Sequence, residues 1–349
     1  MEWTHCRGYW VGGDILYGRI DPANPNLQPE ARSVLAYLYE VRGKKVITGQ
    51  HTQTMAQEEL AYIQRTTGKQ PALCGFELLS YSPNINPTDM TQACYTEILE
   101  NQNTLEKVWQ WAQKGGLITF TWHWFSPLGG TDKSFYTKNT DFDARKILEP
   151  DTPEQQAFYR DLKVMARCLQ PFCHAHIPIL WRPFHECEGR WFWWGAHGPG
   201  VAQCLYRRMF EYFVNEAHLD NLIWVFNGAS AEAYPGDRMV DILSQDIYSA
   251  ERVYSVYAAQ WAQLQTLPGE QKLLALSEVG TVPDIAQALK KGINWSYYMT
   301  WSKKFATTPA YTSRQKLYAI YHSPYALTLD NLPALYTPKT KKKDGKKDE

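Results

Sequence analysis

The sequence has no long apolar segment and no excess of charge of either sign. None of its 349 residues belongs to an uncharged apolar run approaching about 18 residues, which argues against a transmembrane helix. Lys and Arg together number 36, as do Asp and Glu, so the net charge is zero. A nucleic-acid binder would show a basic surplus. We therefore expect neither a membrane span nor a nucleic-acid partner, and an uncharged partner fits the balance.

Several short catalytic and metal-binding motifs are also absent. The seven cysteines include no CxxC pair, which argues against a zinc ribbon or a thioredoxin-type site. No GxSxG occurs, and Gly189 stands where the HExxH motif of zinc proteases would place the second histidine after His185. No metal or organic cofactor is expected. The first residues, Met1–His5, lack the basic and apolar regions of a signal peptide.

Aromatic residues are abundant, and the C-terminal end has a different composition from the rest. The chain contains 14 Trp and 22 Tyr, which suits either a large aromatic core or stacking against sugar rings. Residues 338–349 are rich in lysine, and we expect them to form a disordered tail. Residues 1–337 are predicted to form one catalytic domain.

Short apolar runs alternate with amphipathic helical segments along this domain. Each run is apolar on both faces, as in a buried parallel strand, and eight such runs predict a single-domain α/β fold, the (β/α)8 TIM barrel. A doubly wound open sheet is the alternative, but residues 49–52 are not the glycine-rich phosphate loop it would require after the first strand. The predicted strands are Lys45–Thr48, Ala72–Phe76, Leu117–Trp122, Ile177–Trp181, Leu222–Phe226, Val240–Tyr248, Lys272–Leu276 and Ser296–Trp301.

Residues capable of chemistry gather where these strands end, which is the end of a barrel that carries active sites. Two glutamates, Glu186 and Glu278, follow the fourth and seventh strands. A pair of carboxyl groups suits glycoside hydrolysis, in which one protonates the leaving oxygen and the other attacks the sugar or activates water. The spacing alone does not decide which glutamate has which role. The other candidates at the strand ends are His123, Trp124, Arg182, His185, Tyr248 and Trp301.

Several of these segments resemble glycoside hydrolase family 26 of clan A, whose members are mainly endo-β-1,4-mannanases. The segment from Trp181 to Glu186, followed by Trp191, resembles the acid/base strand of that family. Ser277–Gly280 is similar to its nucleophile segment, and residues 246–248 are similar to its sixth strand. The resemblance spans roughly residues 45–302. One departure is Glu77 on the second strand, where Asp is expected.

The resemblance implies a retaining endo-β-1,4-mannanase that acts on mannan, galactomannan or glucomannan by double displacement. Glu186 is then the acid/base and Glu278 the nucleophile. Arg182 and His185 are expected to orient the glutamates, Tyr248 to contact the nucleophile, and His123 to contact the sugar. Trp191, Trp301 and Trp124 are expected to stack on sugar rings. A polysaccharide substrate further implies a monomer that is secreted, periplasmic or attached to the cell surface.

Three alternatives remain open at this point. A mixed-linkage β-glucanase or β-xylanase of the same family would keep the mechanism and change the sugar. A non-catalytic sugar-binding barrel would have no need for a paired acid and nucleophile. A metal-dependent hydrolase would need a ligand spacing that the sequence does not show.

Overall fold

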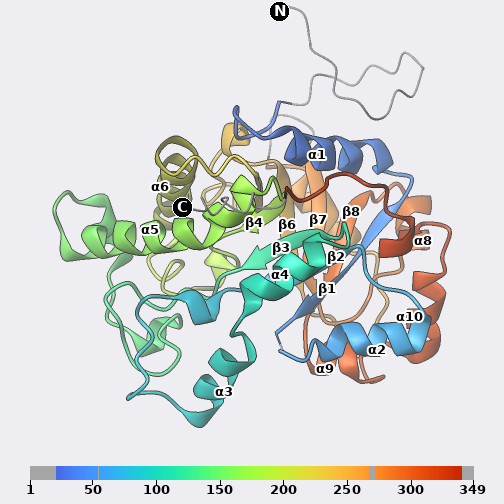
Figure 1. Cartoon of the computed structure of the whole chain (residues 1–349), viewed down its shortest axis with the longest axis horizontal. Helices are drawn as coiled ribbons and strands as arrows, with labels where there is room; N and C mark the ends of the chain where they lie inside the picture. The colour runs from blue at the N-terminus through green and yellow to red at the C-terminus, as the bar shows by residue number, and fades with distance from the viewer. Residues whose placement is uncertain (1–20, 54, 268–271, 340–349) are drawn as a thin grey trace, which may run out of the picture.

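The strands close into a barrel of eight parallel strands, as the alternating apolar runs predicted (Figure 1). The computed structural model describes residues 21–53, 55–267 and 272–339. The strands pair in chain order from β2 to β8, and β1 closes the ring by pairing with both β8 and β2. Their bounds are β1 Val46–Thr52, β2 Leu73–Glu77, β3 Leu117–Thr121, β4 Ile179–Arg182, β5 Leu222–Asn227, β6 Ile242–Ile247, β7 Leu273–Val279 and β8 Trp295–Thr300.

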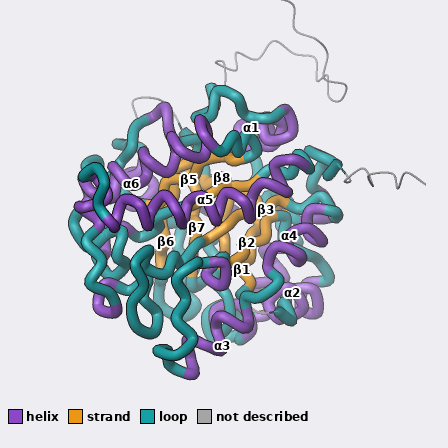
Figure 2. The backbone as a smooth tube through the Cα atoms, turned by 60° about the vertical axis from the view of Figure 1, so that its left-hand side comes forward, coloured by secondary structure: helices purple, strands orange, loops and turns teal. Residues whose placement is uncertain are grey.

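Helices surround the barrel, and α5 crosses directly in front of the strands in Figure 2. The helix α5 begins at Pro153, because Thr152 accepts a hydrogen bond from the Gln155 amide at 3.2 Å and Pro153 occupies the first helical position. The helices are α1 Pro29–Val41, α2 Glu58–Thr67, α3 Gln92–Glu100, α4 Thr104–Ala112, α5 Pro153–His174, α6 Pro199–Glu211, α7 Ala258–Leu264, α8 Ile285–Lys290, α9 Lys304–Thr307 and α10 Arg314–Tyr321.

Two long amphipathic segments of the sequence form divided or shorter helices in the structure. The segment 91–114 forms two helices, α3 and α4, because Asn103 adopts a left-handed backbone with φ of 57° between them. Asparagine tolerates this conformation better than most residues. In the segment 250–267 only α7 is helical, and an irregular stretch precedes it. In Figure 1, α3 lies below α4 and apart from the strands, and its Glu97 lines a cavity together with Glu278.

One further short strand and a terminal contact lie at the opposite end of the barrel. The strand β9, Ala326–Leu327, pairs in parallel with Val46 and Ile47 at the start of β1. Of the predicted tail, residues 340–349 lie outside the described residues, as does the Met1–His5 segment. The main-chain N–H of Lys339 donates to the carbonyl of Ala175 at 2.8 Å, so the described chain ends packed beside α5.

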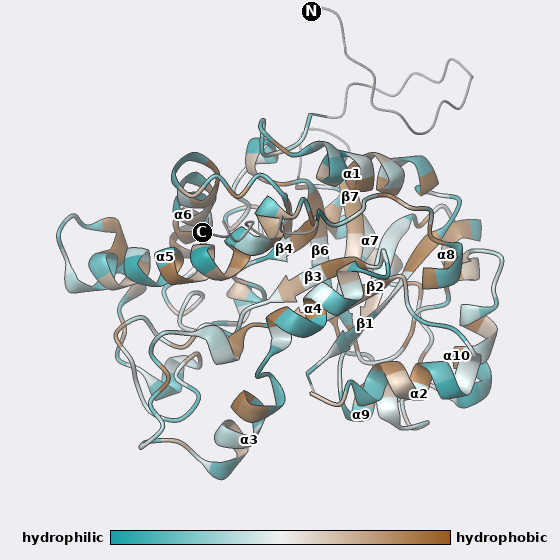
Figure 3. Cartoon of the chain, viewed as in Figure 1, coloured by the Kyte–Doolittle hydropathy of each residue, from teal (hydrophilic) through white to brown (hydrophobic). Residues whose placement is uncertain are grey.

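The core fills the barrel and the space between strands and helices. All residues of β7 are buried, as are all residues of β1. Figure 3 shows apolar residues concentrated on the strands and on one side of several helices. The six cysteines among the described residues are all unpaired thiols. Within the described ranges, no helix combines the length and apolar character that spanning a membrane requires.

The close approach of β1 and β8 generates a prediction about stability. A methyl group added at Gly49 would lie 2.4 Å from the carbonyl oxygen of Tyr298, which is backbone and cannot move aside cheaply. Gly49→Ala should lower the free energy of unfolding by about 1–3 kcal/mol, as measured by urea denaturation. Gly200→Ala is the control, because its added methyl would meet only a Glu232 side-chain oxygen at 3.4 Å. Equal stability of the two variants would contradict the prediction.

Candidate active site

Three carboxyl groups converge at the carboxyl end of the barrel. Carboxylate oxygens of Glu186, Asp246 and Glu278 lie within 4.8 Å of one another. Asp246 and Glu278 are register partners on β6 and β7, and Glu186 follows β4. The parallel order of the strands therefore brings together groups that are up to about ninety positions apart in the chain.

Arg182, the last residue of β4, lies between two of these carboxylates. It is 1% exposed, and its Nη1 donates to Oδ2 of Asp246 at 2.8 Å. Its Nη2 donates to Oε1 of Glu278 and, at 2.8 Å, to Oγ1 of Thr121. Charge-assisted bonds of this kind are strong and directional. The guanidinium therefore fixes Glu278 and compensates its charge.

Tyr248 holds the other oxygen of Glu278. Its hydroxyl donates to Oε2 at 2.5 Å, so both carboxylate oxygens of Glu278 accept a hydrogen bond. Burial raises the pKa of the Tyr248 hydroxyl far above its usual range, and the charge of Glu278 adds to that effect. Tyr248 therefore remains a hydrogen-bond donor at any physiological pH.

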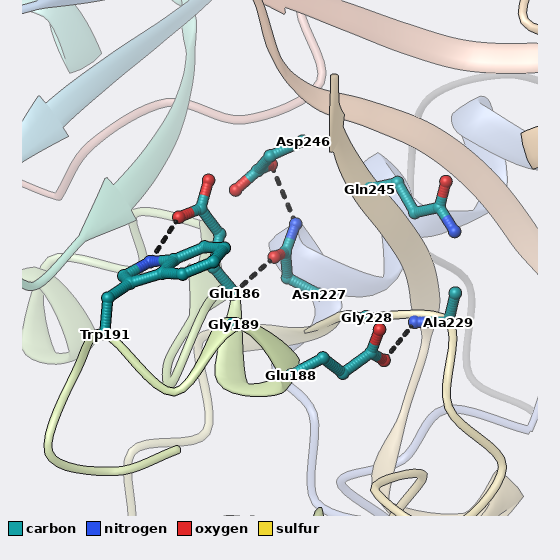
Figure 4. A pocket seen from close by; sticks show the side chains of 9 residues that line it. All are labelled: Glu186, Glu188, Gly189, Trp191, Asn227, Gly228, Ala229, Gln245 and Asp246. Atoms are coloured by element: carbon teal, nitrogen blue, oxygen red, sulfur yellow. Dashed lines mark hydrogen bonds between the residues drawn. The ribbon is translucent and has the colours of Figure 1, made fainter. Parts of the chain in front are cut away.

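Glu186 is held by a tight turn rather than by a regular strand. Its backbone is left-handed, with φ of 54°, and the same is true of Phe184 and Arg190 at 52° and 60°. The main-chain N–H of Glu186 donates to Oδ1 of Asn227 at 2.9 Å, and the indole N–H of Trp191 donates to its carboxylate at 2.9 Å (Figure 4). Burial raises the pKa of Glu186, and the negative charge of Glu278 raises it further. A carboxyl group in this environment suits the role of an acid.

Asp246 is a site residue that the sequence analysis did not select. Its Oδ1 accepts from Nδ2 of Asn227 at 2.8 Å and its Oδ2 accepts from Arg182. Burial raises its pKa well above the usual range, although Arg182 opposes this effect. Its position two residues before Tyr248 was an available signal, because alternate residues of a strand face the same side.

His123 and His185 contact each other, and Glu77 holds His123. Nδ1 of His123 lies 2.7 Å from Oε2 of Glu77, whose Oε1 accepts from the His123 main-chain N–H. Burial lowers the pKa of the His123 imidazole, but the hydrogen bond and charge of Glu77, together with the charges of Glu278 and Glu97, raise it by more, so the net shift is upward. His185 was expected to orient the glutamates, and this stays a prediction; His185 lines one cavity together with Glu186 and Glu278. Its Nε2 lies 3.2 Å from Nε2 of His123, and burial lowers its pKa well below the usual range.

The tryptophans divide into exposed and buried groups. Trp191 is 48% exposed beside Glu186, and Trp301 stacks on His51 with ring centroids 4.0 Å apart. Trp124, expected to stack on a sugar, is instead 1% exposed, so this prediction is wrong. Its ring stacks on Trp122 and its indole N–H donates to Asp161, so Trp124 belongs to the buried core.

Glu186 lines two cavities. One, of about 180 Å³, includes Trp191, Asn227 and Asp246 (Figure 4). The other, of about 200 Å³, includes Glu278, His123 and Trp301. The acidic cluster could in principle attract a cation, but hydrogen-bond donors already occupy both oxygens of Asp246 and both of Glu278. The arrangement suits acid–base chemistry on a ligand that occupies both cavities.

Comparison with known proteins agrees with this geometry. The model of glycosyl hydrolase family 26 matches residues 23–331. The chain belongs to this family. A mannan endo-1,4-beta-mannosidase of Thermothelomyces thermophilus is 36% identical to this family 26 chain over 319 residues, which are 88% of the chain and 62% of that relative. A mannan endo-1,4-beta-mannosidase A of a Piromyces species is 28% identical, over 89% of the chain and 50% of the relative. The chain thus spans about half to three fifths of the length of these two relatives.

Solved family 26 structures share the fold. The Podospora anserina GH26-CBM35 β-(1,4)-mannanase has a TM-score of 0.81 and 34% identity, covering 91% of this chain and 70% of that one. A β-mannanase from a symbiotic protist of the termite Reticulitermes speratus, solved with a gluco-manno-oligosaccharide, has a TM-score of 0.81 and 31% identity. That comparison covers 90% of this chain and 97% of the other.

The surroundings of Glu186 predict how its pKa responds to substitution. Glu278→Gln should lower the pKa of Glu186, because the negative charge that raises it is removed. Trp191→Phe should raise it, because the indole N–H that stabilises the ionised form is lost. A titration followed by NMR of the Glu186 carboxyl carbon measures both shifts. Shifts of the same sign in the two variants would contradict this account of the site.

Proposed function

We propose that the chain is a retaining endo-β-1,4-mannanase that hydrolyses mannan, galactomannan or glucomannan. The observation that supports this most strongly is the separation of at most 4.8 Å between carboxylate oxygens of Glu186 and Glu278. Retaining glycosidases hold their carboxyl groups about 5–5.5 Å apart, whereas inverting ones need about 6.5–9.5 Å to admit a water molecule. The mannosidase names of the relatives support the choice of sugar.

The environments of the two glutamates support a division of roles. The raised pKa of Glu186 favours its protonated form, and Glu186 donates that proton to the glycosidic oxygen as the bond breaks. Glu278, paired with Arg182 and Tyr248, attacks the anomeric carbon and forms a glycosyl–enzyme ester. Glu186, now ionised, takes a proton from water, which attacks the same carbon and releases Glu278. This exchange regenerates both groups with retained configuration.

The other predicted residues surround these steps. We propose that Trp301, which lines the cavity of Glu278, stacks on the sugar under attack, and that Trp191 stacks on the departing sugar. His123 is held by Glu77 and lines the same cavity as Glu278, where it is positioned to form a hydrogen bond with a sugar hydroxyl. Because a polysaccharide does not cross membranes, we also propose that the enzyme acts outside the cell. The monomeric state stays a prediction.

The nucleophile assignment and the choice of sugar can be tested together. The native protein should release reducing sugars from galactomannan and glucomannan, and Glu278→Ala should lower that rate by at least about 10⁴-fold. Circular dichroism checks the fold, and Glu278→Gln is a second variant that keeps the shape beside Arg182. Release by native protein from mixed-linkage glucan or xylan alone would move the specificity to another sugar. Turnover by both variants would contradict the nucleophile assignment.

The acid assignment predicts a dependence on the leaving group. Glu186→Ala should lose about 10²–10⁴-fold activity on mannan, where the departing oxygen needs a proton. With 2,4-dinitrophenyl β-mannobioside, the same variant should give a fast burst of dinitrophenolate and then slow turnover. Dinitrophenolate leaves without a proton from Glu186, whereas hydrolysis of the glycosyl–enzyme still needs Glu186 as the base. Rapid mixing followed by absorbance measures the burst. Equal losses on the two substrates, with no burst, would contradict the role.

A further inference from the structure

The cavity of Glu278 extends to an ion pair that the mechanism above does not use. Lys133, in the loop after β3, and Glu97, in α3, line this cavity together with Glu278 and Trp301. Nζ of Lys133 donates to Oε2 of Glu97, and the two side chains are 24% and 19% exposed. A half-buried ammonium and carboxylate therefore border the same space as the nucleophile.

The elements that carry this pair are fastened to each other. The main-chain N–H and the hydroxyl of Thr91, at the start of α3, both donate to Oδ1 of Asp132 at 2.7 Å. Asp132 immediately precedes Lys133, and its own N–H donates to the carbonyl of Asp89 at 2.6 Å. Near the other end of α3, Glu100 pairs with Lys303, which follows β8, at 2.6 Å. The pair of Lys133 and Glu97 is thus held in position before any ligand binds.

The two cavities define the direction of a bound chain. The sugar that Glu278 attacks must lie in the cavity that Glu278 lines, and the departing sugar must lie beyond Glu186. Trp191 and Asp246 line that second cavity, whereas Lys133 and Glu97 do not. The ion pair therefore lies on the side of the sugars that stay attached to the enzyme.

We propose that Lys133 and Glu97 bind the sugar unit next to the one that Glu278 attacks, on the side that is retained. This inference rests on the proposed function and adds two specificity-determining residues to it. A pyranose presents neighbouring hydroxyls that can both accept and donate. The ammonium donates to one and the carboxylate accepts from another, and bonds with charged partners are stronger than those between neutral groups. The pair makes the enzyme favour substrates with at least two sugars on this side.

The test compares 2,4-dinitrophenyl β-mannoside with 2,4-dinitrophenyl β-mannobioside. The two substrates share a leaving group and differ only in the second retained sugar. Lys133→Met and Glu97→Gln should each lower kcat/KM for the mannobioside about tenfold and leave that for the mannoside within about twofold. The matched control is Glu100→Gln, a change of the same type in the same helix and also in an ion pair with lysine. It should leave the ratio between the two substrates unchanged.

Two results would overturn the inference. Parallel losses on both substrates, or an equal change of the ratio in Glu100→Gln, would mean that the pair only fastens α3. An unchanged ratio in Lys133→Met and Glu97→Gln would mean that no sugar contacts the pair. Failure of the proposed substrate is a separate outcome, recognised when the native protein hydrolyses the corresponding glucosides and neither mannoside. The same comparison is then made with the glucosides and decides the role of the pair.

Discussion

The buried guanidinium of Arg182 is the interaction on which the rest of the active site depends. Burying a charged group away from water costs roughly several kcal/mol of free energy unless the group is paired and hydrogen-bonded. Arg182 meets this requirement only because its partners on β3, β6 and β7 lie within reach at the same level of the barrel. The closure of the barrel therefore also fixes the position of Glu278, because it brings Arg182 and its partners together.

This dependence explains the presence of Asp246. In the proposed mechanism Glu278 becomes a neutral ester, and if Glu278 were its sole partner, Arg182 would then have no ionic partner. Asp246 stays beside the guanidinium throughout, and Asn227 binds both Asp246 and the main chain of Glu186. Asn227 thus joins the network around Glu278, the proposed nucleophile, to the turn that carries Glu186, the proposed acid. Glu186 and Glu278 are therefore connected by hydrogen bonds through Asn227, which takes no part in the proposed reaction.

Much of the fold could be predicted from the sequence, because a buried parallel strand is apolar on both faces and short. The family resemblance and the strand ends also led to Glu186 and Glu278. Contacts between strands were harder to predict. The spacing of Asp246 and Tyr248 indicates a shared face, but the partners of Asp246 and Glu77 depend on register and burial, which local spacing does not encode. Trp124 was expected to stack on a sugar because of the family resemblance, which does not show that its side chain is buried beyond the end of β3.

The left-handed turn at Phe184, Glu186 and Arg190 has a consequence for how the protein tolerates change. A left-handed backbone at a residue other than glycine costs roughly 1–2 kcal/mol, so a segment of seven residues concentrates several such costs beside the acid. Anchors outside the turn, such as the bond from the indole of Trp194 to the carbonyl of His185, oppose its relaxation. Selection for thermal resistance alone would favour glycines here, at the expense of a precisely aimed carboxyl group. Robustness and catalytic power therefore compete within this single turn.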